Sequence, residues 1–202
     1  MPFIVWTGVE EWLTEAAQVE LAESGLSARG VQLGADPAPF RVDYRLEAPR
    51  SHVTSELELT ATAEGWSRRL LLEHDGEGGW RADFADTGDV PGGPWDGLPD
   101  LSEARDIDIE NSPLTNTMPI LREGFRAGGS GDFVMAFVLM PTLRVEASPQ
   151  RYEHLRVTDG GSVVRYISRD GDFQADLELD ADGLLVLYPR LAKRVEPGLK
   201  VG

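Results

Sequence analysis

Alternation of apolar and polar residues with a period of two is the feature that most constrains the fold of this chain. Three segments show it clearly: residues 40–48, 56–63 and 173–180. In the first of them, Val42, Tyr44 and Leu46 fall on one side and charged residues on the other. Successive side chains of a strand point to opposite faces, and an antiparallel sheet can keep one face in water. The pattern therefore predicts an all-β, mainly antiparallel fold.

Turn residues separate the predicted strands. The segments Asp75–Gly79 and Asp180–Gly183 are rich in Gly and Asp and lie between apolar runs, which is typical of β-hairpins. Residues 86–100 form the longest irregular stretch, and we interpret them as an Ω-type loop because the strand pattern resumes beyond it. The sequence contains no internal repeat, so we expect a single domain over residues 1–202.

Residues 11–23 fit two interpretations. A helix would align Leu13 with Leu21, whereas a strand would also turn both inward but would leave Glu15 as a polar misfit. Two glycines follow at a spacing that suits a hairpin-like return of the chain. We therefore favour a strand.

Charge and cysteine content exclude several classes of function. The chain carries 35 acidic and 19 basic side chains, a formal net charge of −16, and no cysteine. Disulfides and thiolate metal sites are excluded. Such an acidic protein repels phosphate backbones and anionic membrane surfaces, so we expect no nucleic-acid partner.

The N-terminal segment indicates a location in the cytoplasm. It has no basic region, and its apolar run ends at Glu10, which does not fit a secretory signal. The longest apolar run, residues 133–140, is far shorter than the roughly 20 residues that a membrane-spanning helix needs. We expect no stable membrane insertion.

Common catalytic and metal-binding motifs are missing. No phosphate-binding glycine loop occurs, and Ser130 lacks the flanking glycines of a nucleophile elbow. His52, His74 and His154 are isolated from one another in the sequence. A calcium loop beginning at Asp106 fails at its glycine and glutamate positions. We expect no cofactor and no metal.

Asp106 and Asp108 leave two interpretations open. On an extended strand they point the same way, roughly 6.5 Å apart, which is a spacing that a pair of catalytic carboxylates can use. One hypothesis is therefore a hydrolase that acts on a sugar or an ester with these two residues. The alternative is a polar strand face followed by a loop of Asx and ST turns.

The loop from Ser112 to Pro119 is dense in short polar side chains between two prolines. We predict that Asn116 is buried there and hydrogen-bonds to backbone groups of a neighbouring segment. A ligand-facing Asn116 is the alternative.

The same residues resemble the signature of a bacterial family named "Putative glycolipid-binding". The resemblance runs from Trp6 to Arg194. It is carried by these segments: residues 106–109, 112–120, 66–68, 79–80, 150–152, 182–183 and 188–190.

This resemblance implies a curved sheet rolled into a spiral β-roll or half-barrel, similar to bacterial carriers of lipoproteins and glycolipids. It also implies a small apolar or amphipathic, glycolipid-like ligand in the concavity. Phe137 and these residues are candidates for binding it: Trp66, Arg68, Asp106, Asp108, Asn116, Gln150, Tyr152 and Tyr188. The hydrolase and a non-catalytic protein-interaction domain are the alternatives, and a homo-oligomer is compatible with all three.

Overall fold

Fourteen β-strands and one short helix make up residues 2–196, the part of the chain that the computed structural model describes. The first seven strands are β1 (Phe3–Gly8), β2 (Leu13–Ala22), β3 (Gly25–Gly34), β4 (Phe40–Ala48), β5 (Glu56–Ala63), β6 (Trp66–His74) and β7 (Trp80–Gly88). They are followed by β8 (Ala104–Ile109), α1 (Thr117–Arg122), β9 (Ser130–Val138), β10 (Val145–Thr158), β11 (Gly161–Ser168), β12 (Gln174–Asp180), β13 (Leu185–Tyr188) and β14 (Ala192–Arg194). Residue 1 and residues 197–202, the ends of the predicted domain, lie outside the described residues.

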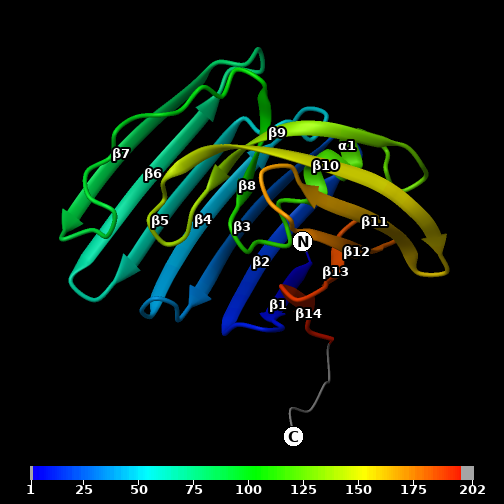
Figure 1. Cartoon of the computed structure of the whole chain (residues 1–202), viewed down its shortest axis with the longest axis horizontal. Helices are drawn as coiled ribbons and strands as arrows, with labels where there is room; N and C mark the ends of the chain where they lie inside the picture. Colours follow the sequence, from blue (N-terminus) through cyan, green and yellow to red (C-terminus); the bar gives the residue numbers. More distant parts are fainter. Residues whose placement is uncertain (1, 197–202) are drawn as a thin grey trace, which may run out of the picture.

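All fourteen strands belong to one sheet (Figure 1). Their order is β7-β6-β5-β4-β3-β2-β1-β14-β13-β12-β11-β10-β9-β8. Every neighbouring pair is antiparallel except β8 and β9, which run parallel. A parallel pair requires a crossover, and here the chain makes it through α1. The all-β, mainly antiparallel prediction is confirmed.

The strands predicted from alternation are present. Residues 40–48 and 56–63 form β4 and β5, and the predicted hairpins join β6 to β7 and β12 to β13. The ambiguous segment after Glu11 is strand β2, which pairs with both β1 and β3. Period two was therefore the correct choice over a helix.

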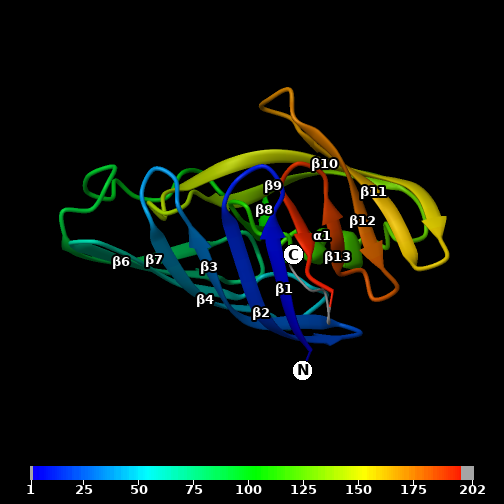
Figure 2. The same ribbon diagram turned by 90° about the horizontal axis from the view of Figure 1, so that it is seen from below.

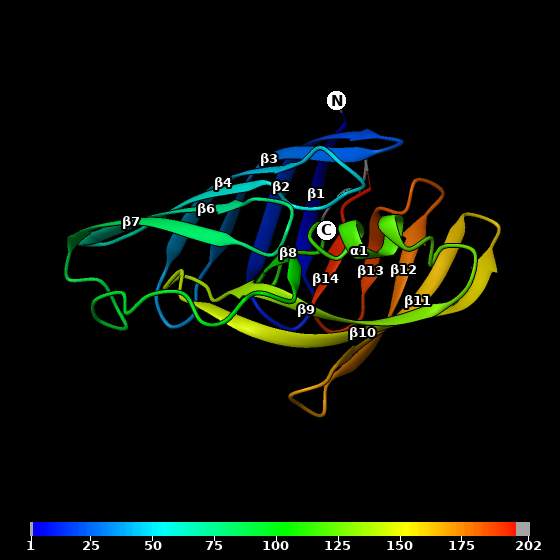
Figure 3. The same cartoon turned by 90° about the horizontal axis from the view of Figure 1, so that it is seen from above.

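The predicted spiral roll or half-barrel agrees with the structure only in that all strands belong to one sheet. The sheet is open, with β7 and β8 as its two edges, and it is neither closed nor strongly curled. Strands β8–β10 instead lie across the inner face of the N-terminal strands, with β11–β14 joining the two parts at one side (Figures 2 and 3). Side chains from both parts share one apolar core, which includes Leu59 and Leu70 on one side and Ile107 and Val138 on the other.

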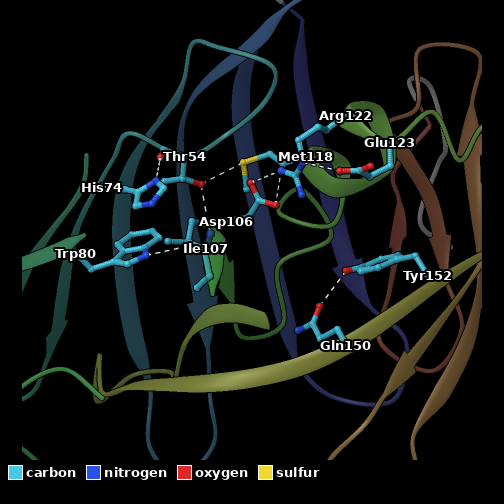
Figure 4. A network of polar contacts seen from close by, with 11 residues as sticks. Thr54, His74, Trp80, Asp106, Ile107, Met118, Arg122, Glu123, Gln150 and Tyr152 are labelled. Atoms are coloured by element: carbon cyan, nitrogen blue, oxygen red, sulfur yellow. Dashed lines mark hydrogen bonds and ion pairs between the residues drawn. The ribbon is translucent and has the colours of Figure 1, made fainter. Parts of the chain in front are cut away.

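Strand β8 is held to the opposite part of the sheet by specific polar contacts (Figure 4). The Thr54 hydroxyl accepts a hydrogen bond from the Ile107 amide at 3.2 Å, and the Thr54 amide donates to the Arg105 carbonyl at 3.2 Å. The Trp80 indole donates to the Ala104 carbonyl at 3.0 Å. These contacts satisfy backbone groups along an edge that would otherwise be unpaired.

Candidate functional site

The strand that carries Asp106 and Asp108 is buried. Only 1% of Asp106 and 7% of Asp108 is exposed, because α1, the loop before it and β10 cover them. The polar strand face predicted as the alternative to a catalytic pair is therefore turned into the protein and not toward water. Alternation could not reveal this, since a polar residue marks a wet face only when no partner side chain covers it.

Asp106 forms an ion pair with Arg122 from the last turn of α1 (Figure 4). One guanidinium nitrogen of Arg122 donates to both carboxylate oxygens, at 2.6 and 2.8 Å. Burial raises the pKa of Asp106, and the positive charge of Arg122 opposes that shift. The pair ties the helix to β8.

Among residues 2–196, Asp108 has no cationic partner. It accepts hydrogen bonds from the Thr115 hydroxyl and the Gln150 amide, both at 2.7 Å. Burial raises its pKa to about 6, and the nearby carboxylates of Glu110 and Asp106 act in the same direction. The two aspartates thus have different environments, one ion-paired and one held only by neutral donors.

Asn116 extends this network from the loop. It is 3% exposed, its amide donates to the Ser112 carbonyl at 3.3 Å, and its oxygen lies 3.0 Å from the Tyr152 hydroxyl. The same Tyr152 hydroxyl lies 3.0 Å from the side-chain oxygen of Gln150. The prediction that Asn116 is buried is confirmed, whereas the predicted hydrogen bond to backbone groups of a neighbouring segment is not found among the described residues. Its backbone partner lies in its own loop, and its contact with a neighbouring segment is to the Tyr152 side chain.

Glu15 is a member of the network that no motif identified. It is 1% exposed, and one of its carboxylate oxygens accepts from the Ser112 hydroxyl at 2.9 Å and from the Tyr44 hydroxyl. Burial raises its pKa to about 7. The available signal was its position as the polar misfit on the inward face of β2.

A cleft of about 510 Å³ opens beside Asp106. Its apolar wall is formed by Phe133, Val134 and Pro149 of β9 and β10. Gln150 and the Asp106–Arg122 ion pair form its polar side. Arg122 also lies over the Phe133 ring, with the guanidinium carbon 5.7 Å from the ring centre. An apolar and a polar surface therefore face the same space.

A second, smaller space lies on the other side of the network. This hollow of about 230 Å³ is lined by four aromatic residues, Phe137, Tyr166, Phe173 and Tyr188. Asp108 lines it as well, together with Asn111, Ser112 and Asn116.

Asp106 and Asp108 therefore open onto different spaces. No residue lines both the cleft and the hollow, and the Asp108–Gln150 hydrogen bond lies between them. Two carboxylates that share the hydrolysis of one bond must reach that bond from the same cavity. The geometry thus does not support the hypothesis that this pair acts together as acid and base.

The structure brings together seven of the nine candidate binding residues and leaves two apart. Trp66 and Arg68 lie on β6, and neither lines the cleft or the hollow. Arg68 is fully buried and pairs with Asp86 at 2.7 Å, while it donates to the carbonyls of Thr142 and Gly93. These contacts hold the long loop after β7 in place.

Neither a metal cluster nor a membrane-crossing helix occurs among the described residues. Within residues 2–196, no three His, Asp or Glu side chains gather as ligands for a metal ion. No helix of that part of the chain has the length and apolar character needed to cross a bilayer.

Comparisons with known proteins agree with this fold. The model of a family described as "Putative glycolipid-binding" matches residues 3–194. The crystal structure of a DUF1089 family protein from Pseudomonas aeruginosa is similar, with a TM-score of 0.71 and 25% identity. The similarity covers 90% of this chain and 92% of that chain. No curated protein matches the sequence.

Proposed function

This chain belongs to the "Putative glycolipid-binding" family, and from that membership we propose that it binds a small amphipathic, glycolipid-like ligand in the cleft beside Asp106. The cleft itself is the observation that carries the proposal. Its 510 Å³ falls within the roughly 300–1,000 Å³ of small-molecule sites. It also combines an apolar wall with a few fixed polar groups, which is the usual composition of such sites.

The charges around the cleft favour an uncharged or zwitterionic polar group. Arg122 is shared between Asp106 and Glu123, whose carboxylate lies 2.9 Å from the Arg122 guanidinium. At the rim, Arg169 faces Asp132 at 3.7 Å. A third cation, Arg105, lines the cleft as well, but carboxylates outnumber the cations there: Glu103, Asp106, Glu123 and Asp132. A strongly anionic headgroup would therefore compete with carboxylates for Arg122 and Arg169 and would be repelled by the excess negative charge. A neutral polar group can hydrogen-bond to the exposed side chains of Glu103 and Arg105, which also line the cleft, without that cost.

The apolar part of the ligand would pack on Phe133. This ring is half-buried and stands edge-on to Tyr152 at a centroid distance of 6.0 Å, so it is held from behind and presents a surface to the cleft. Rigid aromatic walls of this kind contribute binding energy at little entropic cost.

Calorimetric titration with octyl β-D-glucopyranoside, at concentrations below micelle formation, tests the proposal. Methyl β-D-glucopyranoside serves as the ligand without a tail. We expect the octyl glycoside to bind, and Phe133→Ala to weaken its binding about tenfold, equivalent to about 1.4 kcal/mol of lost aromatic contact.

Phe3→Ala is the matched control, since Phe3 is 70% exposed on β1 and lines neither space. It should bind the octyl glycoside as the wild type does. No binding by the wild type, or binding that Phe133→Ala leaves unchanged while the variant remains folded, would contradict the proposal.

A further inference from the structure

Two tyrosine hydroxyls in the hollow lack a partner within the described chain. Tyr166 on β11 is 8% exposed and Tyr188 on β13 is 6% exposed. No hydrogen bond from residues 2–196 reaches either hydroxyl, and burial is the main cause that raises the pKa of both side chains. Tyr44 and Tyr152, the other two tyrosines, both have side-chain partners. A phenol that is more than nine-tenths buried normally finds a hydrogen-bond partner.

The hydroxyls are not sealed inside the protein. Neither is among the buried polar atoms without access to solvent, and both tyrosines line the hollow. Whatever fills the hollow must therefore satisfy these two hydroxyls. Asn111, which is held at a φ of 62° on the rim of the same space, adds a half-buried amide.

The charges of the hollow exclude an anionic ligand. Asp108 and Glu110 line it, and none of its lining residues is basic. Arg190 lies over the Phe173 ring, with its guanidinium carbon 5.7 Å from the ring centre. A guanidinium nitrogen of Arg190 lies 3.4 Å from a carboxylate oxygen of Glu10. A phosphate or carboxylate would meet carboxyl groups there without a free cation.

The aromatic rings also do not form a cage for a quaternary ammonium group. Tyr166, Phe173 and Tyr188 pack against one another, with centroid distances of 6.0 to 6.2 Å. A cation cage needs ring faces arranged around a central space. Here the rings contact each other instead and do not surround a central space. A ligand in the hollow would meet one aromatic wall and the two tyrosine hydroxyls.

We propose that this hollow is a binding site for a neutral, hydroxyl-rich ring such as a pyranose sugar. The free hydroxyls of Tyr166 and Tyr188 and the amide of Asn111 would hydrogen-bond to the ring hydroxyls, and the aromatic wall would contact its C–H face. The volume of 230 Å³ equals that of about seven or eight water molecules, which suits one ring and not an extended chain. This site is separate from the cleft, and the two share no lining residue.

Fluorine NMR of protein labelled with 3-fluorotyrosine tests this inference, because the chain has only four tyrosines. The probes are methyl β-D-glucopyranoside, methyl α-D-mannopyranoside, methyl β-D-galactopyranoside and myo-inositol. We expect at least one probe to shift the Tyr166 and Tyr188 resonances and to leave those of Tyr44 and Tyr152 in place. Tyr166→Phe and Tyr188→Phe assign the signals, and each should weaken binding about three- to tenfold through the loss of one hydrogen bond.

Two outcomes would overturn the proposal. One is the absence of any shift at Tyr166 and Tyr188 with every probe at millimolar concentration. The other is a response to tetramethylammonium but to none of the glycosides or inositol, which would assign the hollow to a cation.

Comparing the affinities for methyl and octyl β-D-glucopyranoside shows whether the hollow binds a free sugar or the sugar end of an amphiphile. Equal affinity for methyl and octyl β-D-glucopyranoside indicates a free sugar, and tighter binding of the octyl form indicates the sugar end of an amphiphile. If a glycoside shifts the Tyr166 and Tyr188 resonances and Phe133→Ala leaves the affinity for octyl β-D-glucopyranoside unchanged, the result supports the proposed site in the hollow and contradicts the proposed site in the cleft. Octyl glycoside binding that depends on Phe133 but shifts no tyrosine supports the cleft and contradicts the hollow.

Discussion

Tyr152 has one hydroxyl proton and two acceptor oxygens within reach, those of Asn116 and Gln150, each at 3.0 Å. One of these contacts therefore lacks a hydrogen. A proton on Asp108 resolves this if the Gln150 amide is turned over. Asp108 then donates to the Gln150 oxygen, the Gln150 nitrogen donates to Tyr152, and Tyr152 donates to Asn116. In that arrangement, with Asp108 neutral, each of these contacts carries a hydrogen.

Stability should accordingly depend on pH through Asp108. Its pKa of about 6 in the folded protein lies above the usual 3.8, so the folded state binds the proton more tightly. The resulting stabilisation is complete below about pH 3.8 and is lost as the pH rises through 6. We expect Asp108 to account for a fall of about 2–3 kcal/mol in the free energy of unfolding across that range.

Asp108→Asn isolates this contribution, because its amide nitrogen can donate to Gln150 at any pH. Urea unfolding of both proteins between pH 4 and pH 8 gives the comparison. The variant should lose less stability than the wild type as the pH rises. Parallel curves would mean that Asp108 does not carry the proton.

Asn116 offers a second test at the scale of one residue. Asn116→Ala removes the donor to the Ser112 carbonyl and the acceptor for Tyr152. Buried partners left unsatisfied cost about 1–3 kcal/mol, measurable by urea unfolding. Gln174→Ala, at an exposed position of β12, is the control and should change stability by less than about 0.5 kcal/mol. An equal effect of both substitutions would contradict the structural role of Asn116.

Among the elements, β2, β3 and β4 form a unit that places Glu15 under the site. Gly30 of β3 lies directly opposite Tyr44 of β4, and a Cβ atom at Gly30 would lie 2.3 Å from the Tyr44 ring. The missing side chain lets the Tyr44 hydroxyl reach Glu15 across β3. Gly30 is thus required for close approach and not for a turn.

Gly30→Ala should displace Tyr44 and break its bond to Glu15. Overpacking at a buried contact of this kind costs about 1–3 kcal/mol, which thermal or urea unfolding will detect. Gly160→Ala is the matched control, since a Cβ there meets nothing within 4 Å. If Gly30→Ala is as stable as Gly160→Ala, the ring is free to move and the close approach is not needed.

Elements with one wet face could be predicted, and elements buried on both sides could not. β4 and β5 were evident because their polar residues mark the solvent side. β8 and α1 carry Asp106, Asp108 and Arg122 into the interior, where only partners distant in the sequence make their charges tolerable. The helix has six residues and no side-chain cap, so it gives too little local signal to predict.

For the whole molecule, the sequence motif identified residues that lie close together, but it did not give the shape of the spaces that they line. Asp106, Asp108, Asn116 and Gln150 come together because β8–β10 lie across the N-terminal strands. Periodicity cannot specify which strands of a sheet face each other. The same limitation explains why Trp66 and Arg68 on β6 were grouped with residues that they do not contact.

Native mass spectrometry of the protein purified gently from a bacterial expression host tests the central claim, amphiphile binding in the cleft, most directly. We predict a fraction of molecules with an added, lipid-like mass that denaturing conditions release. Phe133→Ala should reduce that fraction, and Phe3→Ala should retain it. A bare protein under gentle conditions, which also takes up no octyl β-D-glucopyranoside when it is supplied, would contradict the account.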